Sequence, residues 1–308
     1  MVDSSGCLES ATALFNPPDI CMKSPSISSL PAAILAAAGL VLGAGSSSAA
    51  VTYSVGDILL GFHTAAGVGS GTSFVFNLGS AASYKNNPSA VPLVNDISGV
   101  LTATFGSGWF SRGDLYWGIA GVRDYAAGGP NSVVDGDAKA TIYISRAASA
   151  PGASSAWSLA TGSTVISSAN SIATMQGANG ADLSLSGGFE GATEAAGTGG
   201  LGVLQDEGNT INSWDEFNPI GGPAFGGILT GGVQGALGTG TTAYLDLYRL
   251  VGRTSASATP NDPAGEGRYI TTFTLNSQGI IGTVPEPGSV LLLGLGGAAA
   301  LLRRRRQS

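Results

Sequence analysis

The stretch Tyr244-Leu245-Asp246-Leu247-Tyr248-Arg249-Leu250 indicates how this chain folds. Large apolar and aromatic residues dominate it, and such runs favour β-strands. Successive side chains of a strand point to opposite faces. One face would carry Tyr244, Asp246, Tyr248 and Leu250, and the other Leu245, Leu247 and Arg249. Because alternation is imperfect, the pattern predicts a strand over Ala243–Val251 that is buried on both sides near one end.

The body of the chain, residues 51–283, contains more runs of this kind. Charged residues make up only 11% of the chain, and Gly, Asn and Pro separate the β-rich runs. The turn between the last two strands is expected at Asn276–Gly279. The other strands are expected at Thr52–His63, Ser73–Leu78, Asp114–Gly121, Ala140–Ser145, Arg268–Leu275 and Ile280–Val284. We therefore expect a mainly β, single-domain body, folded as an antiparallel β-sandwich of the jelly-roll type.

Two short helices are expected beside the strands. Asp96 is placed to cap a helix over Ile97–Phe105, with apolar residues recurring at helical spacing. A second helix is expected at Ser167–Met175. Residues 187–242 are rich in glycine, and we expect them to form surface loops.

The C-terminal residues 284–308 have a different organisation. Val284-Pro285-Glu286-Pro287 is followed by an uncharged segment, Gly288–Leu302, and then by Arg303, Arg304, Arg305 and Arg306. As a helix, the uncharged segment would rise about 22 Å, less than the roughly 30 Å of a bilayer core. It predicts a short, weakly held transmembrane helix. The arginines would stay cytoplasmic and act as a membrane stop, so the body would lie outside.

These residues resemble the PEP-CTERM sorting signal of Gram-negative bacteria. Pro285, Glu286 and Pro287 match its recognition motif, and the four terminal arginines match its basic end. The resemblance implies recognition by exosortase, a membrane-embedded transpeptidase that is expected to remove the tail. The same tail is also known as an ice-binding-protein C-terminal domain, a label that gives no evidence of ice binding.

The N-terminal residues indicate export as well. Met22-Lys23 begins a segment typical of signal peptides, with an apolar stretch, Leu30–Leu42, and small residues up to Ala50, after which cleavage is expected. Residues 22–50 would then form a signal helix read by the Sec machinery. Residues 1–21 are interpreted as a misassigned upstream leader; a long natural leader is the alternative.

Cysteine and charge content narrow the chemistry of the mature body. Both cysteines, Cys7 and Cys21, precede Met22, so the body has no thiolate for catalysis or metal binding. Residues 51–284 contain 16 acidic and 8 basic side chains, a net charge near −8. Nucleic acid is therefore not an expected partner, because phosphate neutralisation needs a basic patch.

Few residues point to catalysis or metal binding. His63 is the only histidine and is expected at a strand end. Asp206-Glu207 and Asp215-Glu216 flank Trp214, which could form a glycosidase site or a solvated acidic loop. Asp135 and Asp137 could donate oxygens to Ca²⁺, although a plain turn explains them equally; no other metal or cofactor is expected.

Four tryptophans could provide platforms for sugars. Trp117 lies in an apolar strand and is expected in the core, whereas the other three have loop-like surroundings that leave both roles open. These three are Trp109, Trp157 and Trp214.

The body also resembles a group of secreted PEP-CTERM proteins abundant in Verrucomicrobia, a resemblance that implies localisation and no chemistry. The matching segments are Gly56–Phe62, Phe76–Gly79, Thr104–Gly106, Trp109-Phe110, Asp114–Gly118, Leu245–Tyr248 and Thr272–Leu275.

The expected function is that of a non-enzymatic protein of the cell surface or extracellular matrix, held transiently at the inner membrane before its tail is removed. Its further partner would be extracellular polysaccharide. A carbohydrate-binding module is the first alternative, and a polysaccharide hydrolase is the second.

Overall fold

The computed structural model describes most of the chain between Tyr53 and Val284. The described residues are 53, 56–86, 96–123, 133–134, 136–138, 140–155, 157, 162–176, 193–199, 201–207, 212–226, 229, 232–238, 240–251 and 267–284. All of them belong to one compact unit. The expected leader, signal helix with Ala50, and C-terminal segment from Pro285 onward lie outside these residues.

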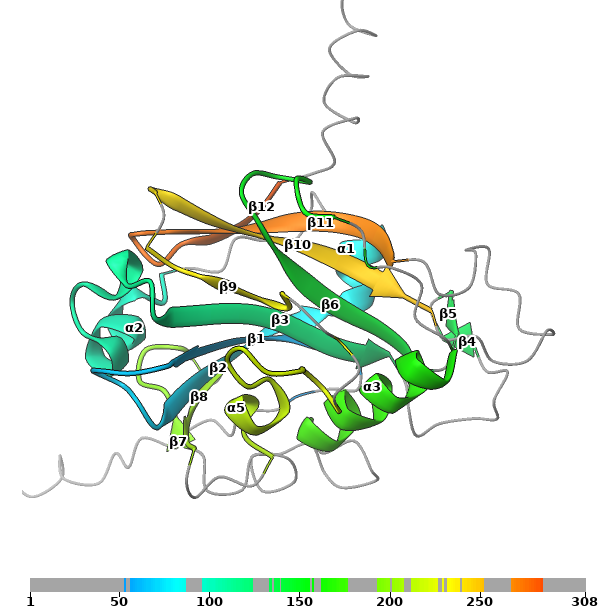
Figure 1. Ribbon diagram of the computed structural model, residues 1–308, viewed down its shortest axis with the longest axis horizontal. Coiled ribbons are helices and arrows are strands. Elements are labelled where there is room, and N and C mark those ends of the chain that lie inside the picture. The colour runs from blue at the N-terminus through cyan, green and yellow to red at the C-terminus, as the bar shows by residue number, and fades with distance from the viewer. Residues whose placement is uncertain are drawn as a thin grey trace, which may run out of the picture. The chain divides into compact units, whose positions relative to one another are not determined.

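Ten strands form one antiparallel sheet in the described part of the chain (Figure 1). Its order is β12-β11-β10-β6-β3-β1-β2-β8-β7, with β9 paired to β3, while β4 and β5 form a separate two-stranded sheet. The strands are Asp57–Thr64 (β1), Thr72–Ser80 (β2), Leu115–Arg123 (β3), Val133–Val134 (β4), Asp137–Ala138 (β5), Thr141–Ala148 (β6), Thr193–Glu194 (β7), Gly202–Asp206 (β8), Gln234–Ala236 (β9), Thr242–Leu250 (β10), Gly267–Asn276 (β11) and Ile281–Val284 (β12).

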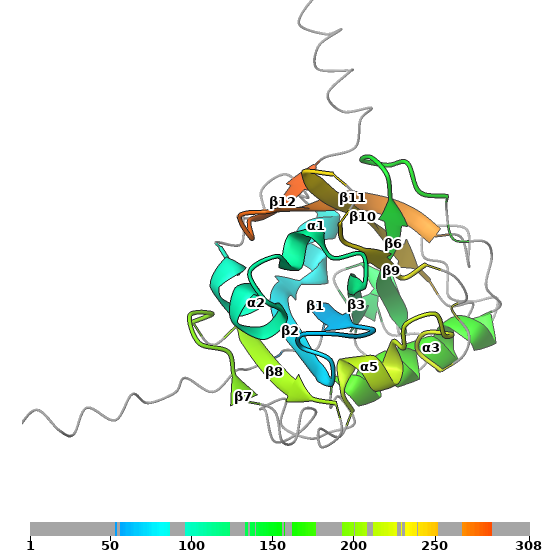
Figure 2. The ribbon, with the colours of Figure 1, turned by 60° about the vertical axis from the view of Figure 1, so that its left-hand side comes forward.

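Helices cover both faces of this sheet. The sheet is curled, and the face on the inside of the curl is called the inner face (Figure 2). The inner face packs against α1 (Ala81–Asn86), α2 (Ser98–Phe105) and the 3₁₀ helix η1 (Trp109–Ser111). The opposite face packs against α3 (Gly162–Met175) and α5 (Trp214–Phe217). Because both faces are covered, strands such as β1 are buried along their whole length.

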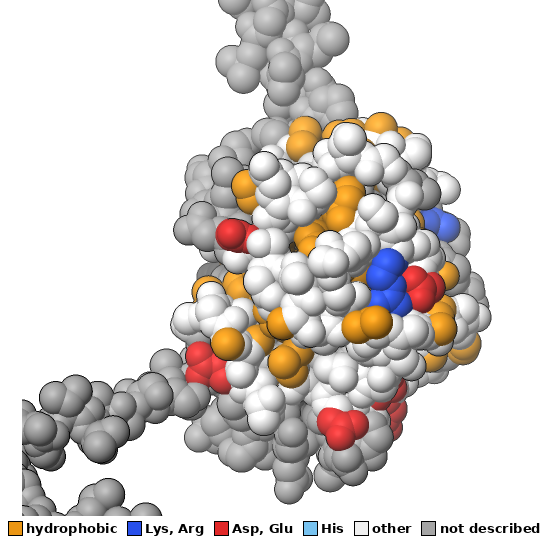
Figure 3. All heavy atoms as spheres, turned by 90° about the vertical axis from the view of Figure 1, so that its left-hand side faces the viewer, with side chains coloured by type: hydrophobic (Ala, Val, Ile, Leu, Met, Phe, Trp, Pro, Cys, Tyr) orange, Lys and Arg blue, Asp and Glu red, His pale blue; other side chains and the backbone are white. Residues whose placement is uncertain are grey.

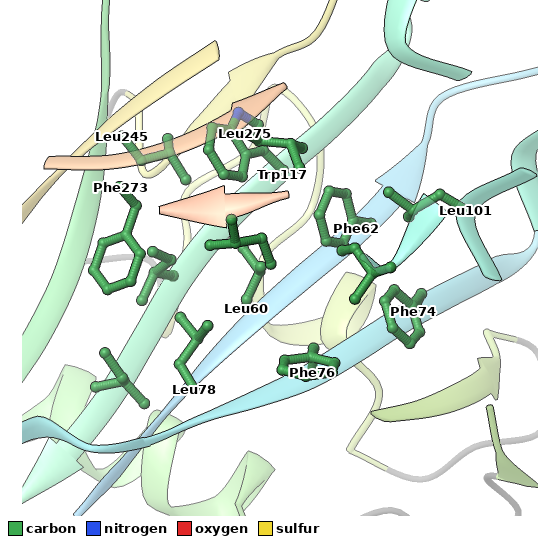
Figure 4. Close-up of a cluster of buried hydrophobic side chains, with 14 of the residues drawn as sticks. Leu60, Phe62, Phe74, Phe76, Leu78, Leu101, Trp117, Leu245, Phe273 and Leu275 are labelled. Carbon is green, nitrogen blue, oxygen red and sulfur yellow. The ribbon is translucent and has the colours of Figure 1, made fainter. Parts of the chain in front are cut away.

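Alternating side chains separate two hydrophobic cores. Leu60 and Phe62 of β1 lie in the inner core (Figure 4), together with Trp117 and Phe273. Leu59 points to the other face and packs with the α3 and α5 side. Figure 3 shows the molecule from the α2 end, where most of the visible surface is uncharged. The fold thus buries apolar side chains in two layers on either side of one sheet.

Ser145 marks the point where β6 separates from β3. The ladder between these strands covers only Ala120–Arg123, and β9 pairs with β3 beyond it. The Ser145 hydroxyl accepts a hydrogen bond from the Ile119 amide (2.7 Å) and can donate to the Val233 carbonyl (2.7 Å). This side chain therefore joins the three chain segments where regular pairing stops.

Asp246 anchors the loop that follows β6. Its side chain is fully buried and accepts hydrogen bonds from the amides of Gly152 (2.9 Å) and Ser154 (2.9 Å) and from the Thr272 hydroxyl (2.5 Å). Hydrogen bonds to an ionised acceptor are stronger than neutral ones. The carboxylate therefore holds the loop on β10 and β11.

The mainly β prediction is confirmed, and each of the seven expected strands overlaps an observed one. The expected turn is also present, since the Gly279 amide donates to the Asn276 carbonyl (3.0 Å). The helix expected at Ile97–Phe105 is α2, which begins at Ser98; its N-cap is Ile97 and not Asp96, although Asp96 accepts a hydrogen bond from the Ser98 amide (3.0 Å). The second expected helix, Ser167–Met175, lies within α3. Local patterns therefore identified most of the sheet.

Two expectations about the fold were wrong. The described residues form one curled sheet where we expected two stacked sheets, because helices cover the faces that a second sheet would have covered. Residues 187–242 are not only loops: they include β7, β8, α5 and β9. β8 forms by pairing with β2, from Thr72↔Asp206 to Phe76↔Gly202, which is a contact that local sequence does not reveal.

No helix in the described ranges is long and apolar enough to cross a membrane. The expected signal helix (22–50) and the C-terminal segment expected to hold the transmembrane helix (284–308) lie outside those ranges, except for Val284.

Candidate functional site

The sorting motif directly follows the folded body. β12 is an edge strand that pairs with β11 from Leu275↔Ile281 to Thr272↔Val284. The Thr271 hydroxyl donates a hydrogen bond to the carbonyl of Val284 (3.0 Å). Pro285 is the next residue, so no linker separates the sheet from the motif. Pro285, Glu286, Pro287 and the four arginines themselves lie outside the described residues.

The two candidate carboxylate pairs are brought together at one end of β8. The Gln205 side-chain oxygen accepts a hydrogen bond from the Trp214 amide (2.9 Å), which places the end of β8 beside the start of α5. Glu207 is half-buried and accepts a hydrogen bond from the Ser73 hydroxyl (3.0 Å). Burial raises the pKa of Glu207, and the negative charges of Asp215 and Asp206 raise it further. Asp206 and Glu216 are exposed.

This arrangement has part of the chemistry that a glycosidase needs. A carboxyl group with a raised pKa can serve as general acid beside an ionised carboxylate. Glu207 and Asp215 lie close enough to influence each other electrostatically. Asp215 also accepts a hydrogen bond from the Ser213 hydroxyl. The hydrolase interpretation therefore stays a hypothesis centred on these two residues.

All four tryptophans are buried, which corrects the interpretation of loop-like tryptophans as candidate platforms. Trp109, Trp117, Trp157 and Trp214 have exposed fractions of 2%, 1%, 7% and 0%. Trp214 packs edge-on against Phe225, with 6.2 Å between ring centroids. Trp157 lies under the Arg146 guanidinium at 4.8 Å. The loop-like sequence around these tryptophans did not reveal their burial. A short segment such as α5 packs onto the sheet, and its tryptophan, Trp214, is the side chain that is buried there.

His63 lies at the end of β1, as expected, and is buried. Its Nε2 forms a hydrogen bond with the side-chain oxygen of Gln234. Burial lowers the pKa of His63 and outweighs the opposing effects of Gln234 and Asp215. The ring is therefore neutral near pH 7 and holds Gln234 in place.

Asp137 belongs to a buried ionic network. Arg249 Nε and Lys85 Nζ lie 2.5 Å and 3.2 Å from its Oδ1, and the Tyr143 hydroxyl donates to its Oδ2 (2.7 Å). Two cations thus already neutralise this carboxylate. Asp135, its proposed partner in Ca²⁺ binding, lies outside the described residues. Within the described ranges, no group of three or more His, Cys, Asp or Glu side chains is placed to hold a metal ion.

A pocket of about 290 Å³ lies between β9 and the segment that follows α5. It is lined by Tyr116, Asn218, Pro219, Ile220, Gly221, Gly222, Ala224, Leu229, Gly232, Val233 and Gln234. Sequence reasoning missed this site, because most of its residues come from a segment that we expected to be loops. No local pattern marks Asn218 or Gln234, which meet only in the folded chain.

Comparison with protein families identifies the tail. Residues 283–306 match the model of the PEP-CTERM protein-sorting motif. The motif defines the class: exported proteins that are processed by exosortase. The match includes Thr283 and Val284 of β12 and leaves the rest of the body uncovered. No curated protein and no solved structure matched the chain, so the resemblance of the body to secreted Verrucomicrobia proteins stays a hypothesis.

Proposed function

We propose that this protein is a non-enzymatic component of the cell surface or extracellular matrix, released from the inner membrane when exosortase removes its tail. The observation that carries the proposal is the position of the sorting motif. It begins in the last strand of the sheet, so cleavage after the motif would release the folded body without cutting into it.

The use of polar side chains in the body supports a structural or binding role. Asp246 anchors a loop, and buried Asp137 forms ion pairs with Arg249 and with the partly exposed Lys85. Arg112 forms a two-point ion pair with Asp114 and also donates to backbone carbonyls of Val68 and Ala66. These charged groups hold loops together, which suits a protein that must persist outside the cell.

Fractionation with C-terminal mass spectrometry tests the processing step. In wild-type cells we expect a mature chain that has lost the segment from Gly288 to Ser308. We expect cells without the transpeptidase, and a variant with Pro285, Glu286 and Pro287 all changed to Ala, to retain the complete tail in the membrane fraction. Gln278→Ala, in the exposed turn before β12, is the matched control and should be processed normally. An intact C-terminus on the mature wild-type protein would exclude processing.

Carbohydrate binding is the second candidate. The burial of all four tryptophans removes the platform argument that first favoured it. The uncharged pocket beside β9 is the remaining feature that supports it.

A further inference from the structure

The strand that leads into the sorting motif is held on one side only. β12 has four residues, and among the described strands β11 is its single neighbour. Ile281 is buried, whereas the other three residues of β12 are only partly buried. Segments with few buried contacts open at a lower free energy than the core of a domain. β12 can therefore separate from β11 while the rest of the sheet stays folded.

The chain leaves the sheet at a defined residue, Val284. Pairing ends at Thr272↔Val284, and the next residue, Pro285, has no N–H to donate to a ladder. β11 also has a bulge at Ile270, directly before Thr271, and a bulge interrupts regular pairing. The last paired residue of the body and the first residue of the motif are therefore adjacent in the chain.

Thr271 provides an additional contact to this last paired residue. Its side chain is fully buried, and its hydroxyl donates a hydrogen bond to the Val284 carbonyl (3.0 Å). The ladder partner of Val284 is Thr272, so the Thr271 contact adds to the pairing of the two strands. The carbonyl belongs to the peptide group that joins Val284 to Pro285. Thr271 therefore holds the peptide group at the start of the motif against the body.

This attachment competes with recognition by an enzyme. Extended peptides are commonly bound through main-chain hydrogen bonds along their length. The sorting signal matches from residue 283, so its first two residues lie in β12. While β12 lies against β11, one side of its main chain is covered by β11, and the Val284 carbonyl is bound by Thr271. These first two residues become fully accessible to an enzyme only when β12 leaves the sheet.

We propose that β12 must separate from β11 before the transpeptidase can remove the tail, and that Thr271 controls how often β12 separates. Thr271 is then a positioning residue, because it acts on access to the motif and takes no part in the reaction. The proposal rests on the proposed function, since it concerns the same processing step. Once the tail is removed, β12 can return to β11, and the mature body ends close to a paired strand.

Pulse–chase labelling in cells that contain the transpeptidase measures how fast the full chain loses its tail. Thr271→Val keeps the branched shape and removes the hydroxyl. If only chains with a separated β12 are processed, the rate follows the population of that open form. Loss of one hydrogen bond should then raise the rate roughly two- to tenfold. Thr242→Val, at the opposite end of the β10–β11 ladder, is the matched control and should be processed at the wild-type rate.

A disulfide between Thr274→Cys and Gly282→Cys tests the opposite change. These two residues pair across the β11–β12 ladder. Antiparallel partners have Cα atoms about 4.5–5.5 Å apart, which is inside the range that a disulfide accepts. Residues 51–308 contain no cysteine of their own. The oxidised variant should lose its tail about tenfold more slowly or not at all, and a reductant should restore the rate. Wild type with the same reductant is the control.

Insertion of Gly-Ser-Gly-Ser-Gly-Ser between Val284 and Pro285 separates access from folding. The insert adds up to about 20 Å of chain, so the motif becomes accessible while β12 stays in the sheet. We expect the inserted chain to be processed faster than the wild type. Neither Thr271→Val nor the disulfide should change the rate of the inserted chain. An effect of the disulfide that persists in the inserted chain would overturn the proposal, because the disulfide would then act on something other than access.

The same experiment distinguishes failure of this proposal from failure of the proposed function. Equal rates for the wild type, Thr271→Val and the oxidised disulfide variant would overturn the role of β12 and leave processing of the tail intact. A wild-type chain that keeps its tail would overturn both.

Discussion

The indole ring of Trp214 lies directly on the backbone of Gly61. A Cβ atom at Gly61 would be 2.1 Å from two atoms of the ring, far inside any normal contact. Glycine is thus the only residue at this position of β1 that lets α5 pack on the sheet. Since α5 carries Asn218 at its C-terminal end, this single contact also positions the pocket.

Gly61→Ala should destabilise the body, because neither the strand nor the buried ring can move away easily. Overpacking of a core typically reduces the free energy of unfolding by about 1–3 kcal/mol. Urea unfolding followed by tryptophan fluorescence measures the loss. Gly99→Ala is the matched control: it lies in α2 with open space around it, so it should stabilise by about 0.5–1 kcal/mol. Equal effects of the two substitutions would contradict the packing argument.

Asp246→Ala should release the loop from Gly152 to Ser154. Removing the carboxylate leaves the buried Ser154 amide without its acceptor, while the Gly152 amide keeps only its contact with the Thr272 hydroxyl (3.1 Å). We therefore expect a loss of about 1–3 kcal/mol. Hydrogen exchange at the Gly152 and Ser154 amides should accelerate strongly. Thr274→Val, on the neighbouring strand, should leave both amides protected. Unchanged exchange in Asp246→Ala would show that other contacts hold the loop.

His63 should make stability fall in mild acid. Burial lowers its pKa in the folded state below the ordinary value of 6.5, so between these two pKa values the unfolded chain binds more protons. Stability therefore rises with pH through that window, is complete above about pH 7, and is lost as pH falls, by up to about 1.4 kcal/mol per pH unit. The measurement is the free energy of unfolding from pH 8 to 5. The difference between wild type and His63→Gln should be constant above the window and shrink within it; a constant difference at all pH values would contradict this.

Glu207→Gln should raise the Tm at neutral pH. Burial and the nearby charges of Asp215 and Asp206 raise the pKa of Glu207, so its ionised form is disfavoured in the folded state. The gain should disappear as pH falls through that raised pKa, because the wild-type carboxyl group is then protonated as well. Glu216→Gln, which is exposed, should change the Tm little. If the body hydrolyses a polysaccharide with Glu207 as general acid, Glu207→Gln would also abolish hydrolysis.

Local sequence was sufficient where a strand carries its own pattern. β10 and β11 could be predicted because large apolar residues recur along them, and the apolar spacing predicted α2 to within one residue of its observed start at Ser98. β8 could not be predicted, because it is stabilised by pairing with β2 about 130 residues earlier in the chain and has only five residues. The single curled sheet was missed for the same reason: the choice between one sheet and two depends on which helices cover the faces.

The candidate sites also differ in whether local sequence reveals them. The sorting motif could be read directly, because it is a contiguous chemical signal. Asp246 was assigned correctly to a face, yet its partners Gly152 and Ser154 are 94 and 92 residues away. Asn218 and Gln234 are ordinary polar residues until the chain brings them together over Gly118. Long-range contacts of this kind leave no trace in local composition.

The absence of a linker between β12 and the sorting motif has a mechanical consequence. Only five residues separate Val284 from Val290, the first branched apolar residue of the tail. Fully extended, the six Cα–Cα steps from Val284 to Val290 span no more than about 22 Å. While the tail is held in the bilayer, this short connection keeps the body close to the lipid headgroups. The body can then diffuse only along the membrane surface. Before the tail is removed, the body can contact only partners at the membrane surface. After removal, it would be able to diffuse away and contact partners farther from the membrane.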